Sequence, residues 1–136
     1  MEALAGDCAV KIGLPELAIF WYNLAKGAGD ETANSKLLTV FNNKLEDARY
    51  SYRKNDISSL WEDVTIALKT GWENGEWYYY YGVCYENGNN YKDAKSMYKL
   101  AKKKKCSPAE TALKSLKNKQ KRKKSVKRQR KKQKRK

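Results

Sequence analysis

Histidine is absent from the sequence, and proline occurs only twice in 136 residues. Without histidine, the chain cannot form Ser–His or Cys–His nucleophile pairs or His-ligated zinc sites. The three cysteines, Cys8, Cys84 and Cys106, are odd in number and form no CxxC pair, which argues against a disulfide framework and a structural zinc site. A phosphate-cradling glycine loop is also missing. We therefore expect no metal, no cofactor and no enzymatic activity.

Long apolar runs are missing as well. No stretch approaches the ~20 apolar residues that span a bilayer. The N-terminal residues MEALAGDC lack the basic and apolar regions of a signal peptide. The expected location is intracellular: cytoplasmic, or nuclear or nucleolar if the cell has a nucleus.

Acidic residues end at Glu110. Residues 1–113 contain 15 Lys/Arg and 15 Asp/Glu and are net neutral, whereas residues 114–136 contain 15 Lys/Arg and no acid. The sequence thus predicts a neutral domain followed by a cationic tail.

The residues that are present favour helices. Scarce proline and abundant Lys, Glu, Leu, Ala and Tyr predict an all-α fold. Helical spacing of apolar residues and the turn residues between them predict hairpins at about 3–27, 31–70 and 76–105, with a capping helix from Pro108. Residues 31–54 can form one long helix, which Asn42 and Asn43 could interrupt. The inward residues expected in the second and fourth helices are Leu17, Ala18, Trp21, Tyr22 and Ala25, and Leu60, Trp61, Val64, Ala67 and Leu68.

The hairpins repeat. Gly82 and Ala48 stand 34 positions apart, as do Asn89 and Asn55. The first hairpin fits the same template, with its residues 42 positions before the matching residues of the second hairpin. Small residues let the helices approach and large ones fill the gaps between them. The matching positions of the first and third hairpins are Gly6 and Gly82, Gly13 and Asn89, Ala18 and Ala94, Tyr22 and Tyr98, and Ala25 and Ala101.

A period of 34 with these small residues resembles the tetratricopeptide-repeat family. The segments YYYYGVCYENGNNYKDAKSMYKLAKKKKCSPAETAL and AIFWYNLAKGAGDETANSKL also resemble its Sel1-like variant. The second hairpin departs from the pattern, since Leu60 stands where alanine is usual. The resemblance implies a right-handed solenoid over residues 1–116, made of about three hairpins and the capping helix. It also implies a concave face that binds peptides or helices of a protein partner.

Nine residues are candidates for that concave groove. A face that mixes arginine and tyrosine is typical of interface hot spots, and a solvated helix face is the alternative. Tyr78, Tyr81 and Tyr85 are instead expected to pack inside the hairpin. The groove candidates are Lys11, Leu45, Arg49, Tyr52, Arg53, Tyr79, Val83, Glu86 and Asn87.

The cysteines are expected to be structural. Cys8 and Cys84 occupy small-residue positions and should be buried. Cys106 follows Lys102–Lys105, whose charges could lower its pKa, although an ordinary exposed thiol is the expectation.

The tail at 117–136 carries the strongest functional signal. Its like charges repel, so the free tail should be disordered or a fraying extension of the last helix, and helical when neutralised. Phosphate backbones are the obvious partner. Because no aromatic residue interleaves with the charges after Tyr98, binding should not depend on base sequence. The candidates for polyanion binding are Lys117, Lys119, Lys121, Arg122, Lys123, Lys124, Lys127, Arg128, Arg130, Lys131, Lys132, Lys134, Arg135 and Lys136.

The leading hypothesis is a non-enzymatic adaptor. Its helical repeats bind a protein partner, and its tail binds nucleic acid, RNA or a ribonucleoprotein, by charge. The alternative is a protein–protein scaffold or structural subunit whose tail is a targeting signal, an anchor for an acidic partner or an anionic membrane, or only a solubilising segment.

Overall fold

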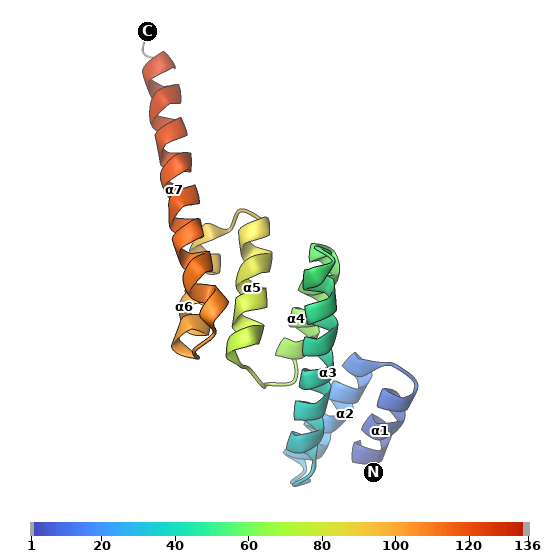
Figure 1. Ribbon diagram of the computed structural model, residues 1–136. Helices are drawn as coiled ribbons and strands as arrows, with labels where there is room; N and C mark the ends of the chain where they lie inside the picture. The colour runs from blue at the N-terminus through green and yellow to red at the C-terminus, as the bar shows by residue number, and fades with distance from the viewer. Residues whose placement is uncertain (1, 135–136) are drawn as a thin grey trace. The chain divides into compact units, whose positions relative to one another are not determined.

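The computed structural model describes residues 2–134, and only the backbone of residues 132–134 (Figure 1). Within that range it contains helices and no strand, which confirms the all-α prediction. The chain divides into two compact units, residues 1–73 and 74–136. The seven helices are α1 (Glu2–Lys11), α2 (Pro15–Gly27), α3 (Ala33–Arg53), α4 (Ile57–Leu68), α5 (Gly75–Asn87), α6 (Tyr91–Lys103) and α7 (Ser107–Lys134).

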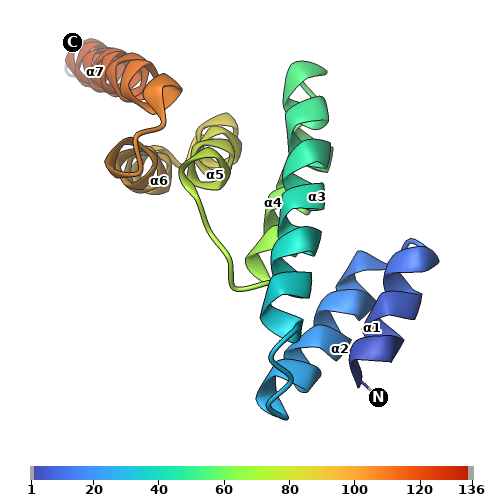
Figure 2. The same cartoon turned by 60° about the horizontal axis from the view of Figure 1, so that its bottom comes forward.

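The first unit contains α1 to α4. Helix α1 pairs with α2, α3 pairs with α4, and α2 packs against α3 (Figure 2). Helix α3 is continuous through Asn42 and Asn43, both of which are exposed, so they do not interrupt it. The core of this unit is formed by Ala9, Ala18, Ile19, Tyr22, Leu37, Val40 and Ile66.

The predicted inner faces of α2 and α4 are partly wrong. Leu17 is exposed and Trp21 is half-buried, whereas Ile19 is buried beside Ala18 and Tyr22. In α4, Trp61 and Leu68 are exposed as well. Apolar residues cover two sides of each helix, so their spacing alone does not determine which side packs inward.

The second unit is the hairpin of α5 and α6 with α7 packed against α6 and touching α5. Its core cluster contains Ala94, Tyr98 and Leu116. Tyr78 and Tyr81 are buried, as predicted, and burial raises the pKa of Tyr81 to about 12. The aromatic run of α5 is therefore mainly packing.

Each unit contains one glycine that lies directly against a tyrosine ring. A Cβ added at Gly6 would lie within 2.4 Å of the Tyr22 ring, and one added at Gly82 would lie within 2.5 Å of the Tyr98 ring. Both rings are almost fully buried. Only glycine lets the paired helices approach this closely around an aromatic ring.

The turns between helices have a common geometry. Gly13, Asn55 and Asn89 adopt left-handed backbone conformations with φ of 77°, 56° and 61°. In all three turns, the amide of the next residue donates to a carbonyl five residues back, as in Leu14 to Ala9 at 2.9 Å. The turns after each hairpin also have left-handed residues, at Gly29, Gly71 and Lys105, with φ of 91°, 81° and 64°. In both sets, the spacings along the chain are 42 and 34 residues.

Helix α7 continues through most of the basic tail. Of the two forms expected for the free tail, the structure has the helical one, as far as Lys134. No glycine or proline follows Pro108, and Lys, Arg and Gln are good helix formers. At a rise of about 1.5 Å per residue, the 28-residue helix is about 42 Å long.

Candidate nucleic-acid interface

The face by which α7 packs on α6 changes character along the helix. Its first part is apolar: Ala109 and Leu116 are buried, and Leu113 packs against the core cluster. The next residues at i, i+3, i+4 and i+7 spacing are Gln120, Lys123, Lys124 and Lys127, and these lie on the same side of the helix. The packing of Leu116 therefore determines the direction in which these lysines point.

Two adjoining hollows, hereafter together called the seam groove, lie at the junction of α6 and α7 and share Lys95 and Gln120 in their linings. Among the described residues, eight lysines and no carboxylate line it, so its electrostatic potential favours an anion. Gln120, Asn89, Asn90 and Tyr91 add polar and aromatic surface. The lysines are Lys92, Lys95 and Lys99 of α6, and Lys114, Lys117, Lys123, Lys124 and Lys127 of α7.

Tyr91 supplies an aromatic ring at one end of the seam groove. Its hydroxyl donates to Asn89 Oδ1 at 3.2 Å, and Lys123 Nζ lies 5.5 Å from the ring centroid. The ring is half-buried. Although no aromatic residue follows Tyr98 in the sequence, folding thus places an earlier one among the tail lysines.

The nearest carboxylates have partners within the second unit. Glu86 accepts from the Tyr98 hydroxyl at 3.3 Å and pairs with Lys119 Nζ at 3.6 Å. Asp93 accepts from the Asn90 side chain at 2.7 Å at the start of α6. Lys119 therefore points towards α5, away from the lysines of the seam groove.

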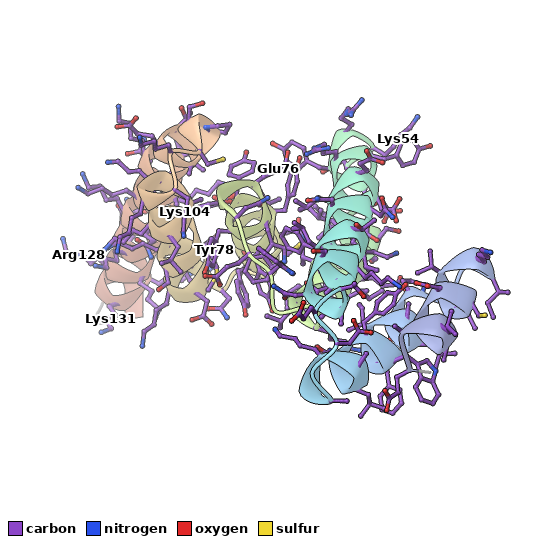
Figure 3. All side chains as sticks on the ribbon, turned by 90° about the horizontal axis from the view of Figure 1, so that it is seen from below. Lys54, Glu76, Tyr78, Lys104, Arg128 and Lys131 are labelled. Atoms are coloured by element: carbon purple, nitrogen blue, oxygen red, sulfur yellow. The ribbon has the colours of Figure 1, made fainter. Side chains whose placement is uncertain are left out.

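Most predicted tail residues lie on the exposed surface of α7. Figure 3 shows Arg128 and Lys131 extending from the helix. Lys132 and Lys134 belong to the helix without described side chains, and Arg135 and Lys136 lie outside the described residues. The exposed ones are Lys117, Lys119, Lys121, Arg122, Lys123, Lys124, Lys127, Arg128, Arg130 and Lys131.

The lysines that α6 contributes to the seam groove were not predicted from the sequence. Lys92, Lys95 and Lys99 stand at i, i+3 and i+7, which is the signal for one face of a helix. This spacing looks like an ordinary solvated surface until α7 is placed beside it.

The groove candidates on α1 and α3 differ in accessibility. Leu45 is 2% exposed and belongs to the core, so its prediction as a partner contact is wrong. Leu45 was expected on the concave face from its alignment with Tyr79, but α3 is oriented so that Leu45 points into the core. Lys11, Tyr52 and Arg53 are exposed, and Arg49 is half-buried.

The candidates on α5 lie close to α6 and α7. Tyr79 and Val83 are half-buried and pack against the core cluster, with the Tyr79 ring 5.8 Å from that of Tyr98. Glu86 is half-buried in the contacts described above. Only Asn87, at the end of α5, is exposed.

The cysteines differ from one another. Cys84 is buried as predicted, but Cys8 is exposed, so the expectation of a buried thiol there is wrong. Cys106 is half-buried, and this burial raises its pKa. The expectation of an exposed thiol at Cys106 is therefore wrong, and desolvation is the main cause of its pKa shift.

Two carboxylates in the first unit have opposite pKa shifts. Hydrogen bonds from Tyr22 at 2.6 Å and Lys36 at 2.9 Å hold the pKa of Asp7 below its usual value. Burial raises the pKa of Asp63, although Ser51 donates to it at 3.0 Å. Both carboxylates join helices: Asp7 links α1 to α2 and α3, and Asp63 links α4 to α3.

The chain matches no protein-family profile, no curated protein and no solved structure. Among residues 2–134, no helix is both long and apolar enough to cross a membrane. In the same range, no three His, Cys, Asp or Glu side chains gather in a way that could hold a metal ion.

Proposed function

We propose that the chain is a non-enzymatic adaptor that binds nucleic acid through its basic C-terminal helix and a protein through its helical repeats. The observation that carries this proposal is the separation of charge. All 15 uncompensated positive charges lie in residues 114–136, and every described Lys or Arg side chain among them is exposed on α7. When Lys and Arg side chains of such a helix neutralise phosphates, the cations condensed on the nucleic acid are released.

The proposed architecture is a right-handed solenoid of about three tetratricopeptide-like hairpins with a capping helix. Three features support it: left-handed turn residues at spacings of 42 and 34, the Gly6–Tyr22 and Gly82–Tyr98 contacts, and the packing of α7 on α6. In this architecture, α7 combines a cap with a nucleic-acid-binding helix.

The outer side of α2 is the apolar surface that best supports a protein partner. Leu17, Phe20 and Leu24 are 41%, 54% and 44% exposed and stand at i, i+3 and i+7. An apolar stripe of this kind on a helix favours contact with another apolar helix face.

The nucleic-acid part is tested by shortening the tail. Because Leu116 is buried, the chain should end after Asn118, which keeps the cap and lowers the net charge from +15 to +2 by removing 13 Lys/Arg. We expect the full chain to bind single-stranded RNA with a slope of log K against log salt of about −0.7 per phosphate contacted. The shortened chain should lose most of both affinity and slope. Unchanged RNA affinity at moderate salt would rule out the tail as the nucleic-acid-binding element.

The exposed stripe of α2 keeps the pure scaffold as a second candidate. Purification from native cells with and without nuclease separates the two candidates. Recovery of a protein partner but no nucleic acid in the untreated sample would favour the scaffold.

A further inference from the structure

We propose that the seam groove binds single-stranded nucleic acid, with phosphates along the lysines of α6 and α7 and one base on the ring of Tyr91. This inference rests on the proposed function and assigns the contact to a folded site rather than to a tail alone. Its key observation is that two helices contribute lysines to two adjoining hollows, and no carboxylate is among the described residues that line them.

The lysines lie in two rows. Lys92, Lys95 and Lys99 follow one side of α6, and neighbours at this helical spacing are about 5–6 Å apart. Lys123, Lys124 and Lys127 of α7 line the other side of the groove. A chain of phosphates lying between the rows would be neutralised from both sides.

Tyr91 favours a single strand over a duplex. A base must be unstacked before its face can meet an aromatic side chain, and single strands supply such bases. Asn89 fixes the tyrosine hydroxyl, and Lys123 already lies over the ring at 5.5 Å. When a base occupies this face, Lys123 is free to move to the adjoining phosphate. Stacking on one ring tolerates any base, which agrees with recognition that does not depend on sequence.

The experiment compares charge-matched variants of the full chain by fluorescence anisotropy with labelled oligouridine over a salt series. The groove variants are Lys92→Gln/Lys95→Gln and Lys123→Gln/Lys124→Gln. Their controls remove two charges outside the groove lining, Lys102→Gln/Lys103→Gln on α6 and Lys121→Gln/Arg122→Gln on α7. We expect each groove pair to reduce the salt slope by about 1.4 and each control pair to change it by much less.

The role of Tyr91 is tested with Tyr91→Leu and Tyr91→Phe. Leucine should weaken oligouridine binding about tenfold, whereas phenylalanine should retain it, because stacking needs the ring and not the hydroxyl. An abasic oligomer of the same length should bind both variants equally, which excludes loss of folding as the cause. A duplex should be insensitive to Tyr91→Leu.

The possible failures are distinguishable. If the full chain binds and the shortened chain does not, but groove and control pairs weaken binding equally, the seam groove is refuted and the proposed function stands. If polyglutamate binds as tightly as oligouridine and loses affinity in the same variants, an acidic protein is the partner instead. If the full chain binds no nucleic acid, the proposed function itself fails.

Discussion

At the scale of single residues, the two glycine–tyrosine contacts show how the hairpins achieve close packing. Gly6 faces Tyr22 and Gly82 faces Tyr98, and the two partners are 16 positions apart in each case. The middle hairpin has Ala48 and Val64 at the same spacing, both buried. Where the first and third hairpins pair glycine with tyrosine, the middle hairpin has alanine and the smaller valine. The summed side-chain volume at this position therefore differs little among the three hairpins.

Replacing Gly82 with alanine should destabilise the second unit. The added Cβ would lie 2.5 Å from the Tyr98 ring, which is 1% exposed and cannot move aside. We expect a loss of about 1–3 kcal/mol in the free energy of unfolding, measured with urea and circular dichroism. The control is Gly27→Ala at the end of α2, where nothing lies within 4 Å of the new Cβ and the stability should not fall. Equal losses in both variants would contradict the steric explanation.

The hydrogen bonds of Asp7 should appear in the pH dependence of stability. Its pKa is lowered from 3.8 in the folded state, so the folded chain binds fewer protons than the unfolded chain around that pH. The stabilisation is present above the unfolded-state value and is lost as the pH falls through the folded-state value. Asp7→Asn should therefore be less stable than the wild type at pH 6, and the difference should shrink towards pH 3. Urea unfolding across this range measures it.

The control for Asp7 is Glu46→Gln on the exposed side of α3. It removes one negative charge and should change the free energy of unfolding by less than about 0.5 kcal/mol. A difference between wild type and Asp7→Asn that stays constant with pH would mean that the carboxylate does not titrate differently on folding.

At the scale of elements, α7 consists of an anchored part and a solvated part within one helix. Ala109 and Leu116 are buried, while every described side chain from Lys121 to Lys131 is exposed. Most of the helix that carries the charge is therefore not held by packing. Its position depends on a few apolar contacts near its start.

Leu116→Ala should remove the main anchor of α7. Loss of a fully buried leucine costs about 2–5 kcal/mol, because a cavity remains beside Ala94 and Tyr98. The matched control is Val126→Ala on the same helix, where the side chain is 47% exposed and the change should be below about 0.5 kcal/mol. Urea unfolding of both variants tests this, and similar small effects would show that α7 is not anchored through Leu116.

At the scale of the whole molecule, the division into two units separates the proposed binding helix from the first two hairpins. The seam groove lies entirely within residues 74–136. A ligand that binds only the folded second unit stabilises that unit, by about 2.7 kcal/mol at 100 times the dissociation constant. No direct stabilisation of the first unit is expected.

Hydrogen exchange with mass spectrometry measures this difference. A saturating oligouridine should slow exchange in α5 and α6 and leave α3 and α4 unchanged. If exchange in α3 and α4 slowed by a similar factor, the ligand would stabilise both units, and the two units would not unfold independently.

Much of the fold could be predicted from sequence because its determinants are local. The turn residues Gly13, Asn55 and Asn89 fit left-handed positions, and the small residues at Gly6 and Gly82 mark close helix contacts. The inward side of α2 could not be predicted, because Leu17 and Ile19 lie on different sides and are equally apolar. The exposure of Cys8 also depends on which neighbours cover α1, and spacing does not report this.

The candidate site was predictable only in part. The charge of the tail is evident from composition, but the seam groove requires residues from 89–99 and 113–127 to meet in space. Leu45 and Tyr79 fit the register of a concave face, yet one lies in the core and the other packs beside Tyr98. Registers transferred between hairpins predict which residues share a side of a helix, but tertiary packing decides which side is open.

Because α7 is one uninterrupted helix, the angle around the helix axis between Leu116 and the seam-groove lysines of α7 is fixed. One alanine inserted between Asn118 and Lys119 would turn every later side chain by about 100° while leaving every charged residue of the tail in place. Four inserted alanines would turn them by about 400°, close to the original direction. If binding depends on the seam groove, the single insertion should weaken it and the fourfold insertion should largely restore it, as measured with oligouridine. If recognition depends on charge alone, the single and the fourfold insertion should bind oligouridine equally well.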